Sequence, residues 1–577
     1  MNRIWLVLLL AAPLACADLP GRYFRLLEAG SAQVEAKLNS TPGADLKTIE
    51  AQSGWRHFPY AILAPAVLYS KRHAANPRYG DPKMRDLAIR IGDLLASENE
   101  KGVYEQRGDS DWDDYMWLEA YRLLGGSLGE ERRARWRREI EKNIALLVED
   151  AEDRVGFPWY NSPYIGTSPN HYALWAGNLY LGGRVFGNTK WQQLGARILK
   201  RYATEEQTPD GYWGEHSRNG PTIGYNHLTL SALAVYFEHS GDREVLPALR
   251  RATDLHKYFT FLDGTSVDVI NDRNRRWGVS AWSQFAFSHF PDGRGYAEFL
   301  AKFFEPASLT VDALGRLAQD ALYYHEGPSL APPQAQSRYA HRMQQAPAGV
   351  RKTGDWQVAL SGLIDTQAIN SRFYLDRQGH LSVFHRQAGL IITGANSKRQ
   401  PEIATFNETV GGTVVHMPLS SRLQMSENED RLSLAYNTFF SDLYVAAAAD
   451  QTLGLRFVIS GRGAPGPDTR LNLQLCLKAG EAIETGSGKR LVLGADRVDL
   501  SPSDLQRRIV HHGWTLELPQ GASLSRPIYP HNPYADLPET NIAYAVGRLA
   551  VPLGLQAQPG KYVRAKELEL AFRLRVP

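Results

Sequence analysis

The hydrophobic period of this chain changes once, near residue 325, and the change restricts the folds that the chain can adopt. Up to residue 324, apolar residues recur at spacings of three and four, which is the period of one helix face. Gly-rich turns such as Leu124-Gly-Gly separate these segments. The expected helices cover residues 60–69, 84–97, 114–124, 130–147, 170–185, 191–202, 227–237 and 245–259. Helices joined by short turns, with no strand pattern between them, predict an N-terminal incomplete (α/α) toroid over residues 18–325.

After residue 325 the pattern changes to short alternating runs bounded by Gly, Asp, Asn and Pro. A Pro-rich stretch that begins Gly327-Pro-Ser-Leu-Ala-Pro-Pro indicates a linker over residues 326–350. The expected strands cover residues 373–376, 380–385, 390–393, 413–416, 432–436, 443–447, 455–460, 471–477, 542–546 and 567–576. Many short alternating strands predict a C-terminal antiparallel β-sandwich over residues 351–577.

Length and charge limit the functional classes. A chain of 577 residues is too long for one core, which agrees with two domains. The net charge of +3 and the absence of a basic run argue against a nucleic-acid partner. The sequence also has no Gly-x-Ser-x-Gly elbow, phosphate loop or HExxH motif.

The N-terminus has the pattern of a secretory signal. Arg3 precedes an apolar run over residues 4–14, and Ala15-Cys16-Ala17 is a small-residue cleavage site. We expect a signal peptide over residues 1–17, cleaved after Ala17, and a secreted or periplasmic protein. A lipoprotein processed at Cys16 is the minority alternative. If Cys16 is removed, Cys476 is the one remaining cysteine, so cysteine-based metal sites and an intrachain disulfide are excluded. No later apolar run is long enough for a membrane span.

Two polar clusters open predicted helices. Ser168 is a candidate N-cap and Pro169 the first helical residue, which puts Asn170 and His171 in the first turn. A helix start offers free backbone N–H groups and suits an anion such as a sugar carboxylate. A histidine in a helix more often has a structural role. The position of His171 at a capped helix start favours a catalytic role.

The second cluster, Gly224-Tyr225-Asn-His, carries a tyrosine that we single out as a candidate general acid or base. A free phenol has a pKa of about 10, so this role needs nearby positive charge or hydrogen bonds. A loop over residues 211–216 precedes it, in which Glu215 either binds substrate or holds the loop. The residues assigned to substrate binding are Trp213, Glu215, His216, Arg218, Arg273 and Arg276.

These features together resemble the heparinase II/III-like and alginate-lyase-like polysaccharide lyases, on Pro169-Asn170-His171, Glu215-His216, Gly224-Tyr225 and the segment from Gly379-His380 to Gly394. The resemblance implies β-elimination on a uronic-acid-containing polysaccharide. Asn170 would bind the uronate carboxylate, His171 would assist it or act as base, and Tyr225 would transfer the proton to or from the leaving oxygen. A sandwich-domain histidine would assist: His385, with His380 the less favoured choice.

The resemblance requires no cofactor, and we assign no metal ligand. It leaves room for a structural divalent metal in the β-domain, where some relatives carry zinc. Two other functions stay open. One is a glycoside hydrolase on the same toroid, with Asp113 or Asp114 paired with Glu215 or Asp272. The other is a non-catalytic glycan-binding protein of the cell envelope, whose aromatic residues would contact sugar.

Overall fold

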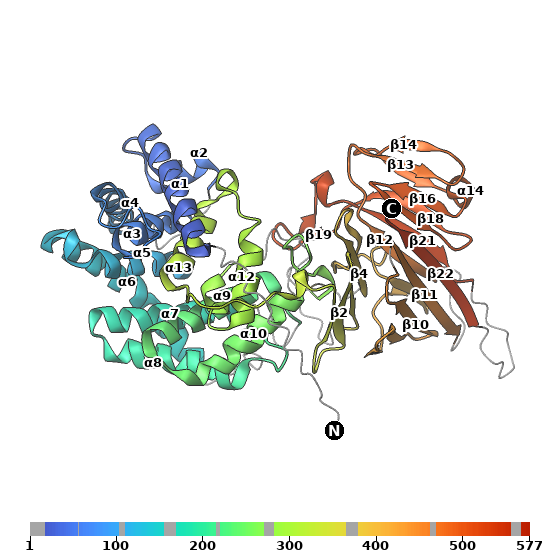
Figure 1. Cartoon of the computed structure of the whole chain (residues 1–577), viewed down its shortest axis with the longest axis horizontal. Coiled ribbons are helices and arrows are strands. Elements are labelled where there is room, and N and C mark those ends of the chain that lie inside the picture. Colours follow the sequence, from blue (N-terminus) through green and yellow to red (C-terminus); the bar gives the residue numbers. More distant parts are fainter. Residues whose placement is uncertain are drawn as a thin grey trace, which may run out of the picture.

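The computed structural model describes residues 18–55, 57–102, 110–154, 169–214, 220–270, 282–364, 375, 379–449, 451–461, 469–554 and 567–577. A helical domain and a β-sandwich domain lie side by side along the long axis of the molecule (Figure 1). The expected toroid-plus-sandwich fold is confirmed. The expected signal peptide lies outside the described residues. Within the described part, no helix combines the length and the apolarity needed to cross a bilayer.

The helical domain is built from thirteen helices among the described residues: α1 (Leu19–Ser40), α2 (Leu46–Ser53), α3 (Leu63–Ser70), α4 (Pro82–Glu100), α5 (Ser110–Leu124), α6 (Glu130–Arg154), α7 (Pro169–Phe186), α8 (Thr189–Arg201), α9 (Ile223–Ser240), α10 (Leu246–Tyr258), α11 (Gln284–Phe287), α12 (Pro291–Ala301) and α13 (Val311–Tyr323). The odd-numbered helices pack each against the next, and α13 contacts both α1 and α3. The even-numbered helices cover them from outside. This alternation of inner and outer helices is the toroid that the spacing of turns predicted.

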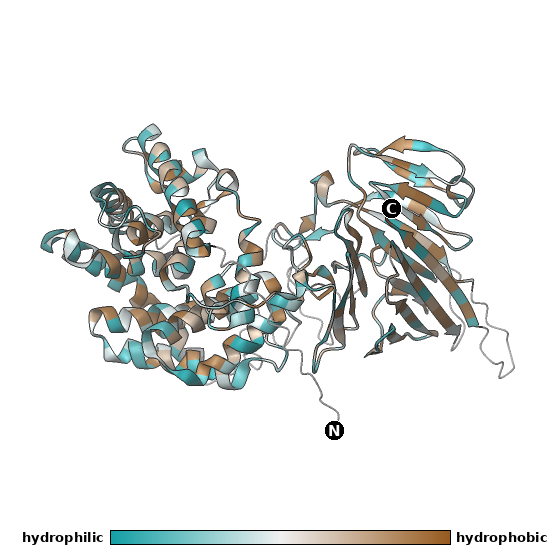
Figure 2. Ribbon diagram, viewed as in Figure 1, coloured by the Kyte–Doolittle hydropathy of each residue, from teal (hydrophilic) through white to brown (hydrophobic). Residues whose placement is uncertain are grey.

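Burial separates the two kinds of helix. The inner helix α9 is apolar around most of its circumference, with residues 226–236 buried without interruption. The outer helix α8 shows the opposite pattern, in which Leu194, Ile198 and Leu199 form one buried stripe. Figure 2 shows hydrophilic residues, in teal, over much of the outer helix α6. An inner helix is enclosed by its neighbours, so the exposed side chains of α9 are confined to its two ends.

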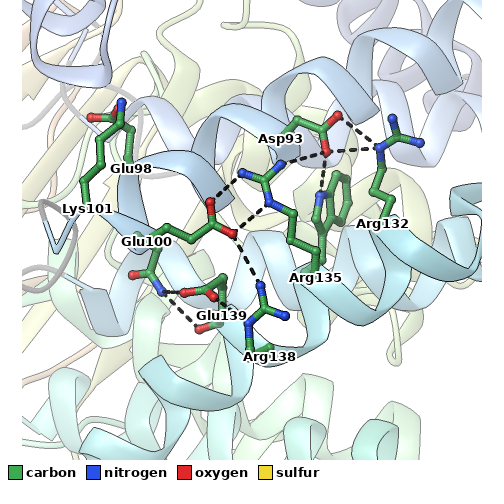
Figure 3. A network of polar contacts seen from close by, with 10 residues as sticks. Asp93, Glu98, Glu100, Lys101, Arg132, Arg135, Arg138 and Glu139 are labelled. Carbon is green, nitrogen blue, oxygen red and sulfur yellow. Dashed lines mark hydrogen bonds and ion pairs between the residues drawn. The ribbon is translucent and has the colours of Figure 1, made fainter.

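The outer helices α4 and α6 are joined by a polar network (Figure 3). Arg135 forms a two-pronged ion pair with Glu100, with nitrogen–oxygen distances of 2.9 and 2.7 Å. Asp93 accepts hydrogen bonds from Arg132 and from the buried indole of Trp136, the latter at 2.9 Å. Exposed ion pairs contribute little alone, so the buried Trp136 carries most of the stabilisation here.

The sandwich strands are β1 (Arg338–Arg342), β2 (Ala348–Thr353), β3 (Trp356–Ser361), β4 (Leu381–His385), β5 (Gly389–Thr393), β6 (Phe406–Val410), β7 (Thr413–Val415), β8 (Ser420–Met425), β9 (Glu429–Ala435), β10 (Phe439–Ala446), β11 (Thr452–Gly461), β12 (Arg470–Leu475), β13 (Ala482–Thr485), β14 (Arg490–Val492), β15 (Val498–Leu500), β16 (Arg508–His511), β17 (Trp514–Glu517), β18 (Ser523–Ile528), β19 (His531–Asn532), β20 (Leu537–Pro538), β21 (Val546–Pro552) and β22 (Glu567–Arg575). A four-residue helix, α14 (Pro502–Leu505), precedes β16.

The strands form two large antiparallel sheets. One has the order β1-β2-β3-β4-β5-β12-β21-β18-β15, with β6 and β7 attached at β12. The other has the order β14-β13-β16-β17-β22-β11-β10-β9-β8. Their facing side chains form a single apolar core. The first sheet presents β2 and β4 toward the helical domain (Figure 1).

Two expected segments differ from the structure. Residues 542–546 were expected to form a strand, but Ile542–Tyr544 is a 3₁₀ turn and the strand begins only at Val546. The reason is Asn541, whose side chain accepts a hydrogen bond from the N–H of Ala543 and so starts a turn. In the expected linker over residues 326–350, β1 and the start of β2 are already present. The expected strand at residues 373–376 lies outside the described residues except for Leu375, which has no assigned secondary structure.

A buried carboxyl joins α13 to the start of α11. Asp320 is fully buried, and its carboxyl oxygen accepts a hydrogen bond from the N–H of Phe285 at 2.9 Å. Burial raises the pKa of Asp320 to about 8, because removal from water disfavours the charged form. The carboxyl is therefore protonated in the folded protein at neutral pH.

This protonation makes stability depend on pH. Between the ordinary aspartate pKa of about 3.9 and the raised value, the folded chain binds a proton that the unfolded chain does not. The contribution of Asp320 to the free energy of unfolding is complete below about pH 4 and is lost as pH rises toward about 8, by at most about 1.4 kcal/mol per pH unit. We expect Asp320→Asn to weaken this decline in denaturant titrations across that range. Equal pH slopes for the two proteins would contradict the assignment.

Candidate active site

The two domains share an apolar cluster that fixes how they meet. It combines Phe259, Phe261 and Val269 of the helical domain with Val350 and Phe384 of the sandwich, all of them fully buried. The rings of Phe261 and Phe384 stack with centroids 5.0 Å apart. A shared core of this kind fixes the position of the helical domain relative to the sandwich.

Polar anchors complete this interface. Asp268, in a 3₁₀ turn (Asp268–Ile270), is 3% exposed and accepts hydrogen bonds from the hydroxyls of Ser382 on β4, at 2.5 Å, and Thr393 on β5. These hydroxyls in turn accept the N–H groups of Gly394 and Ala395. The carboxylate thus fixes the ends of two strands against the toroid, because it satisfies groups that would otherwise be buried without partners.

A second carboxylate holds the loop that precedes the predicted substrate-binding segment. Asp210 accepts backbone N–H groups of Gln344, Gln345 and Ala346, in the turn between β1 and β2, with the Ala346 bond at 3.0 Å. The contact connects the residues before the loop at 211–216 to the sandwich. Asp210 therefore ties the residues just before position 211 to the turn between β1 and β2.

The helices that carry the two predicted clusters run parallel and in register. Gly177 of α7 faces Ala232 of α9, the rings of Tyr180 and Tyr236 lie 4.7 Å apart, and Arg184 donates to the carbonyl of His239. Each pair is separated by 55 or 56 positions in the sequence. The same offset puts Asn170 level with Tyr225, at the N-terminal ends of neighbouring helices.

The phenol of Tyr225 reaches the sandwich domain. Its hydroxyl lies 2.8 Å from the hydroxyl of Tyr534, and both side chains are half-buried. Tyr534 follows β19, where its N–H donates to the side chain of Asn532 at 3.0 Å. The N–H of His531 donates to Gln400 at 2.8 Å and so ties this turn to the sheet. A pair of phenols therefore bridges the domains at the N-terminal end of α9.

Tyr534 was not predicted from the sequence. It lies in Pro530-His-Asn-Pro-Tyr534, a turn-rich stretch that shows neither strand alternation nor helical spacing. With 27 tyrosines in the chain, only the contact with Tyr225 across a separation of 309 residues distinguishes it.

Buried contacts hold the start of α9 in place. The side chain of Asn226 accepts the N–H of Trp213 at 3.2 Å and lies 3.2 Å from His256 Nε2. Burial lowers the pKa of His256 to about 3, so its ring is neutral. Trp213, assigned to substrate binding, is 1% exposed and donates its indole N–H to the carbonyl of Tyr202. Its ring lies in the core and supports the loop instead of offering a face to a sugar.

The amide of Asn170 is buried and unsatisfied. Asn170 is fully buried, and within the described structure neither its side-chain oxygen nor its nitrogen has a hydrogen-bond partner. His171, beside it, is half-buried. We expected Asn170 at an open rim. In this conformation a substrate carboxylate would reach the amide only after a rearrangement around the helix start. A buried amide without partners is costly, and a polar ligand would remove that cost.

His385 does not belong to this junction. Along β4, Ser382 and Phe384 contact the helical domain, whereas Val383 packs into the sandwich core. His385 follows this alternation, and its ring packs edge-on against Trp356 with centroids 4.6 Å apart. The side chain thus faces away from the toroid. His380, the less favoured choice, is fully buried between the carbonyl of Ser361 and the hydroxyl of Tyr436.

The remaining predicted site residues, Glu215, His216, Arg218, Arg273 and Arg276, lie outside the described residues. Their assignment to substrate binding stays a prediction. The described part of the site therefore consists of Asn170, His171, Tyr225 and Tyr534.

The fold is that of polysaccharide lyases. A xanthan lyase from Paenibacillus matches with a TM-score of 0.50 at 9% identity, over 98% of this chain and 58% of that protein. A chondroitin AC lyase from Streptomyces coelicolor A3 gives 0.49 at 11% identity, over 97% and 80% of the two chains. Heparan sulfate lyase HepC from Pedobacter heparinus gives 0.43 at 12% identity, over 90% and 75%.

These similarities concern the fold. This chain spans less than two thirds of the length of the Paenibacillus xanthan lyase. No protein-family model matches the sequence, and no curated protein matches it either.

Removal of the Asp268 side chain should strongly destabilise the protein. Asp268→Ala leaves the hydroxyls of Ser382 and Thr393 without their acceptor, which should lower the free energy of unfolding by about 3 kcal/mol. Thermal unfolding and denaturant titration measure the loss. The matched control is Asp263→Ala, an exposed aspartate of the preceding turn that bonds only locally to Thr265 in the described structure. Equal stabilities of the two variants would contradict the role of Asp268 as an anchor.

Proposed function

We propose that the chain is a polysaccharide lyase that cleaves a uronic-acid-containing polysaccharide by β-elimination. The observation that carries the proposal is the phenol of Tyr225, which stands at the start of an inner toroid helix, at the domain junction and in contact with a second phenol. The toroid-plus-sandwich fold supports the same class of enzyme.

Tyr225 serves as the acid and base of the elimination. It removes the proton from C5 of the uronate, and the electrons move to break the C4–O bond, so the product carries a new double bond and no water is consumed. The proton then passes to the leaving oxygen. A hydrogen bond donated by Tyr534 favours the tyrosinate form of Tyr225, because it stabilises the negative charge on oxygen.

Asn170 neutralises the substrate carboxylate. The C5 proton becomes acidic when the neighbouring carboxylate accepts the developing charge, and a donor amide stabilises that charge as in an oxyanion hole, by about 3 kcal/mol. The unsatisfied amide at the level of Tyr225 supports this role. His171 assists from the same helix turn. The described residues do not support the assistance expected from His385, which faces the sandwich core.

The other two functions receive less support. For a hydrolase, Asp114 would be one of two carboxylates, but it is 1% exposed and accepts a hydrogen bond from Asn143 at 2.9 Å inside the core. Trp213, the aromatic residue assigned to substrate binding, is buried and so offers no ring face to a glycan. Glu215 and Asp272, the partners considered for a hydrolase, lie outside the described residues.

Replacement of Tyr225 tests the proposal. Tyr225→Phe keeps the ring and removes the transferable proton, so formation of unsaturated product should fall at least about 100-fold. The measurement is the ultraviolet absorbance of the unsaturated uronate after incubation with alginate, glucuronan, ulvan, heparan-type and chondroitin-type chains. The matched variant is Tyr534→Phe, which keeps the phenol of Tyr225 and removes only its partner. It should lower turnover less than Tyr225→Phe.

Two outcomes would contradict the mechanism. One is saccharide cleavage without a new chromophore, which indicates hydrolysis. The other is wild-type turnover by Tyr225→Phe. Circular dichroism of both variants checks that the fold is retained, so a loss of turnover is assigned to chemistry.

A further inference from the structure

Two histidines and a glutamate converge at the end of the toroid opposite to the candidate active site. Glu238 lies in the last turn of α9, the helix whose first turn carries Tyr225. At 1.5 Å per residue the two positions are about 20 Å apart. His289 lies between α11 and α12, and His325 follows α13 by two residues. One nitrogen or oxygen atom from each of the three side chains lies within 4.8 Å of the other two.

The distances suit a tetrahedral metal. Nε2 of His289 is 3.4 Å and Nε2 of His325 is 2.7 Å from the same oxygen of Glu238. Ligand atoms of a tetrahedral zinc ion, at bond lengths of about 2.0–2.1 Å, lie about 3.3 Å apart. Small side-chain rotations would bring all three atoms to one centre.

The burial of His289 also supports a metal site. The side chain of His289 is 6% exposed, and in the described structure its Nε2 has no hydrogen-bond partner. Its ring is oriented by Phe237, which packs edge-on with centroids 5.0 Å apart. A fixed, buried imidazole nitrogen aimed at a carboxylate, yet beyond good hydrogen-bond geometry, is the arrangement of a ligand without its ion.

The backbone around the cluster is also fixed. The N–H of His325 donates to Ser288 Oγ at 2.9 Å, and Arg294 donates to the carbonyl of Ser288 at 2.7 Å. The first of these bonds joins the two histidine segments independently of the imidazole rings. The side chain of His325 is 43% exposed, so solvent reaches the cluster from this side.

We propose that Glu238, His289 and His325 bind one divalent transition metal of the zinc class, with water as the fourth ligand. Two imidazoles and one carboxylate suit zinc and its neighbours, whereas calcium and magnesium prefer oxygen ligands throughout. The proposal is independent of the lyase assignment, since the cluster lies at the far end of α9. It also differs from the structural metal for which the resemblance leaves room in the β-domain, because all three ligands belong to the helical domain.

The metal would stabilise the segment that connects the toroid to the sandwich. His325 begins the connection that leads to β1 at Arg338. This connection runs along α12, where Arg294 donates to the carbonyl of Pro328, and reaches α10, where Gln334 donates to the carbonyl of Lys257 at 2.7 Å. An ion at its start would tie the connection to α9 and to the segment before α12.

The test is a zinc titration of the untagged full-length protein after chelator treatment, with a chromophoric chelator as competitor. We expect one equivalent to bind with submicromolar affinity. Glu238→Gln and His325→Ala should weaken this binding at least about 100-fold. The matched control is His512→Ala, which removes a histidine that pairs with Glu481 at 2.7 Å in the sandwich and should leave binding unchanged.

Cobalt supplies a readout that does not depend on variants. Co²⁺ in a four- or five-coordinate nitrogen–oxygen site gives visible absorption bands in the wild-type protein, and zinc should displace them. Zinc should also raise the melting temperature of the wild-type protein but not of His325→Ala. Failure of the protein to bind zinc at micromolar concentrations, or unchanged binding by both ligand variants, would overturn the proposal.

Discussion

The arrangement of this protein depends on the buried contact between the turn at Asp268 and the ends of β4 and β5. A carboxylate that is 3% exposed must have its hydrogen bonds satisfied, and Ser382 and Thr393 satisfy them from the other domain. The apolar cluster around Phe261 and Phe384 surrounds this anchor. Such a contact tolerates little sliding, because displacement would deprive a buried carboxyl group of its hydrogen bonds. The relative position of Tyr225 and Tyr534 follows from it.

The domain fold could be predicted because its signals are periodic. Helical spacing before residue 325 and alternation after it each extend over many residues, so individual errors do not change the architecture. The short segment at 542–546 could not be predicted this way, since the capping side chain of Asn541 decided its conformation. One side-chain hydrogen bond outweighed a weak strand preference there.

The site was predicted unevenly, for a physical reason. Asn170 and Tyr225 each follow Pro or Gly at a helix start, and the constant offset between α7 and α9 brings them level. His385 was chosen because the resemblance implied a sandwich histidine, but strand alternation turns it toward Trp356. Tyr534 could not be predicted, because a local sequence pattern does not indicate which residues meet across two domains. Sequence periodicity describes neighbours within an element, and this contact depends on the assembled interface.

The enclosure of α9 explains why both proposed sites lie where they do. Its middle is buried from Asn226 to Tyr236, so a substrate or an ion can reach this helix only at its ends. The first turn faces the sandwich and contains the phenol. The last turn faces away and contains Glu238, beside the segment between α11 and α12 and the segment that follows α13. The helix that supplies the proposed general base, Tyr225, therefore also supplies the carboxylate of the proposed metal site. Because the two ends are about 20 Å apart, loss of the ion should lower the stability of the protein more than it lowers the activity proposed for Tyr225.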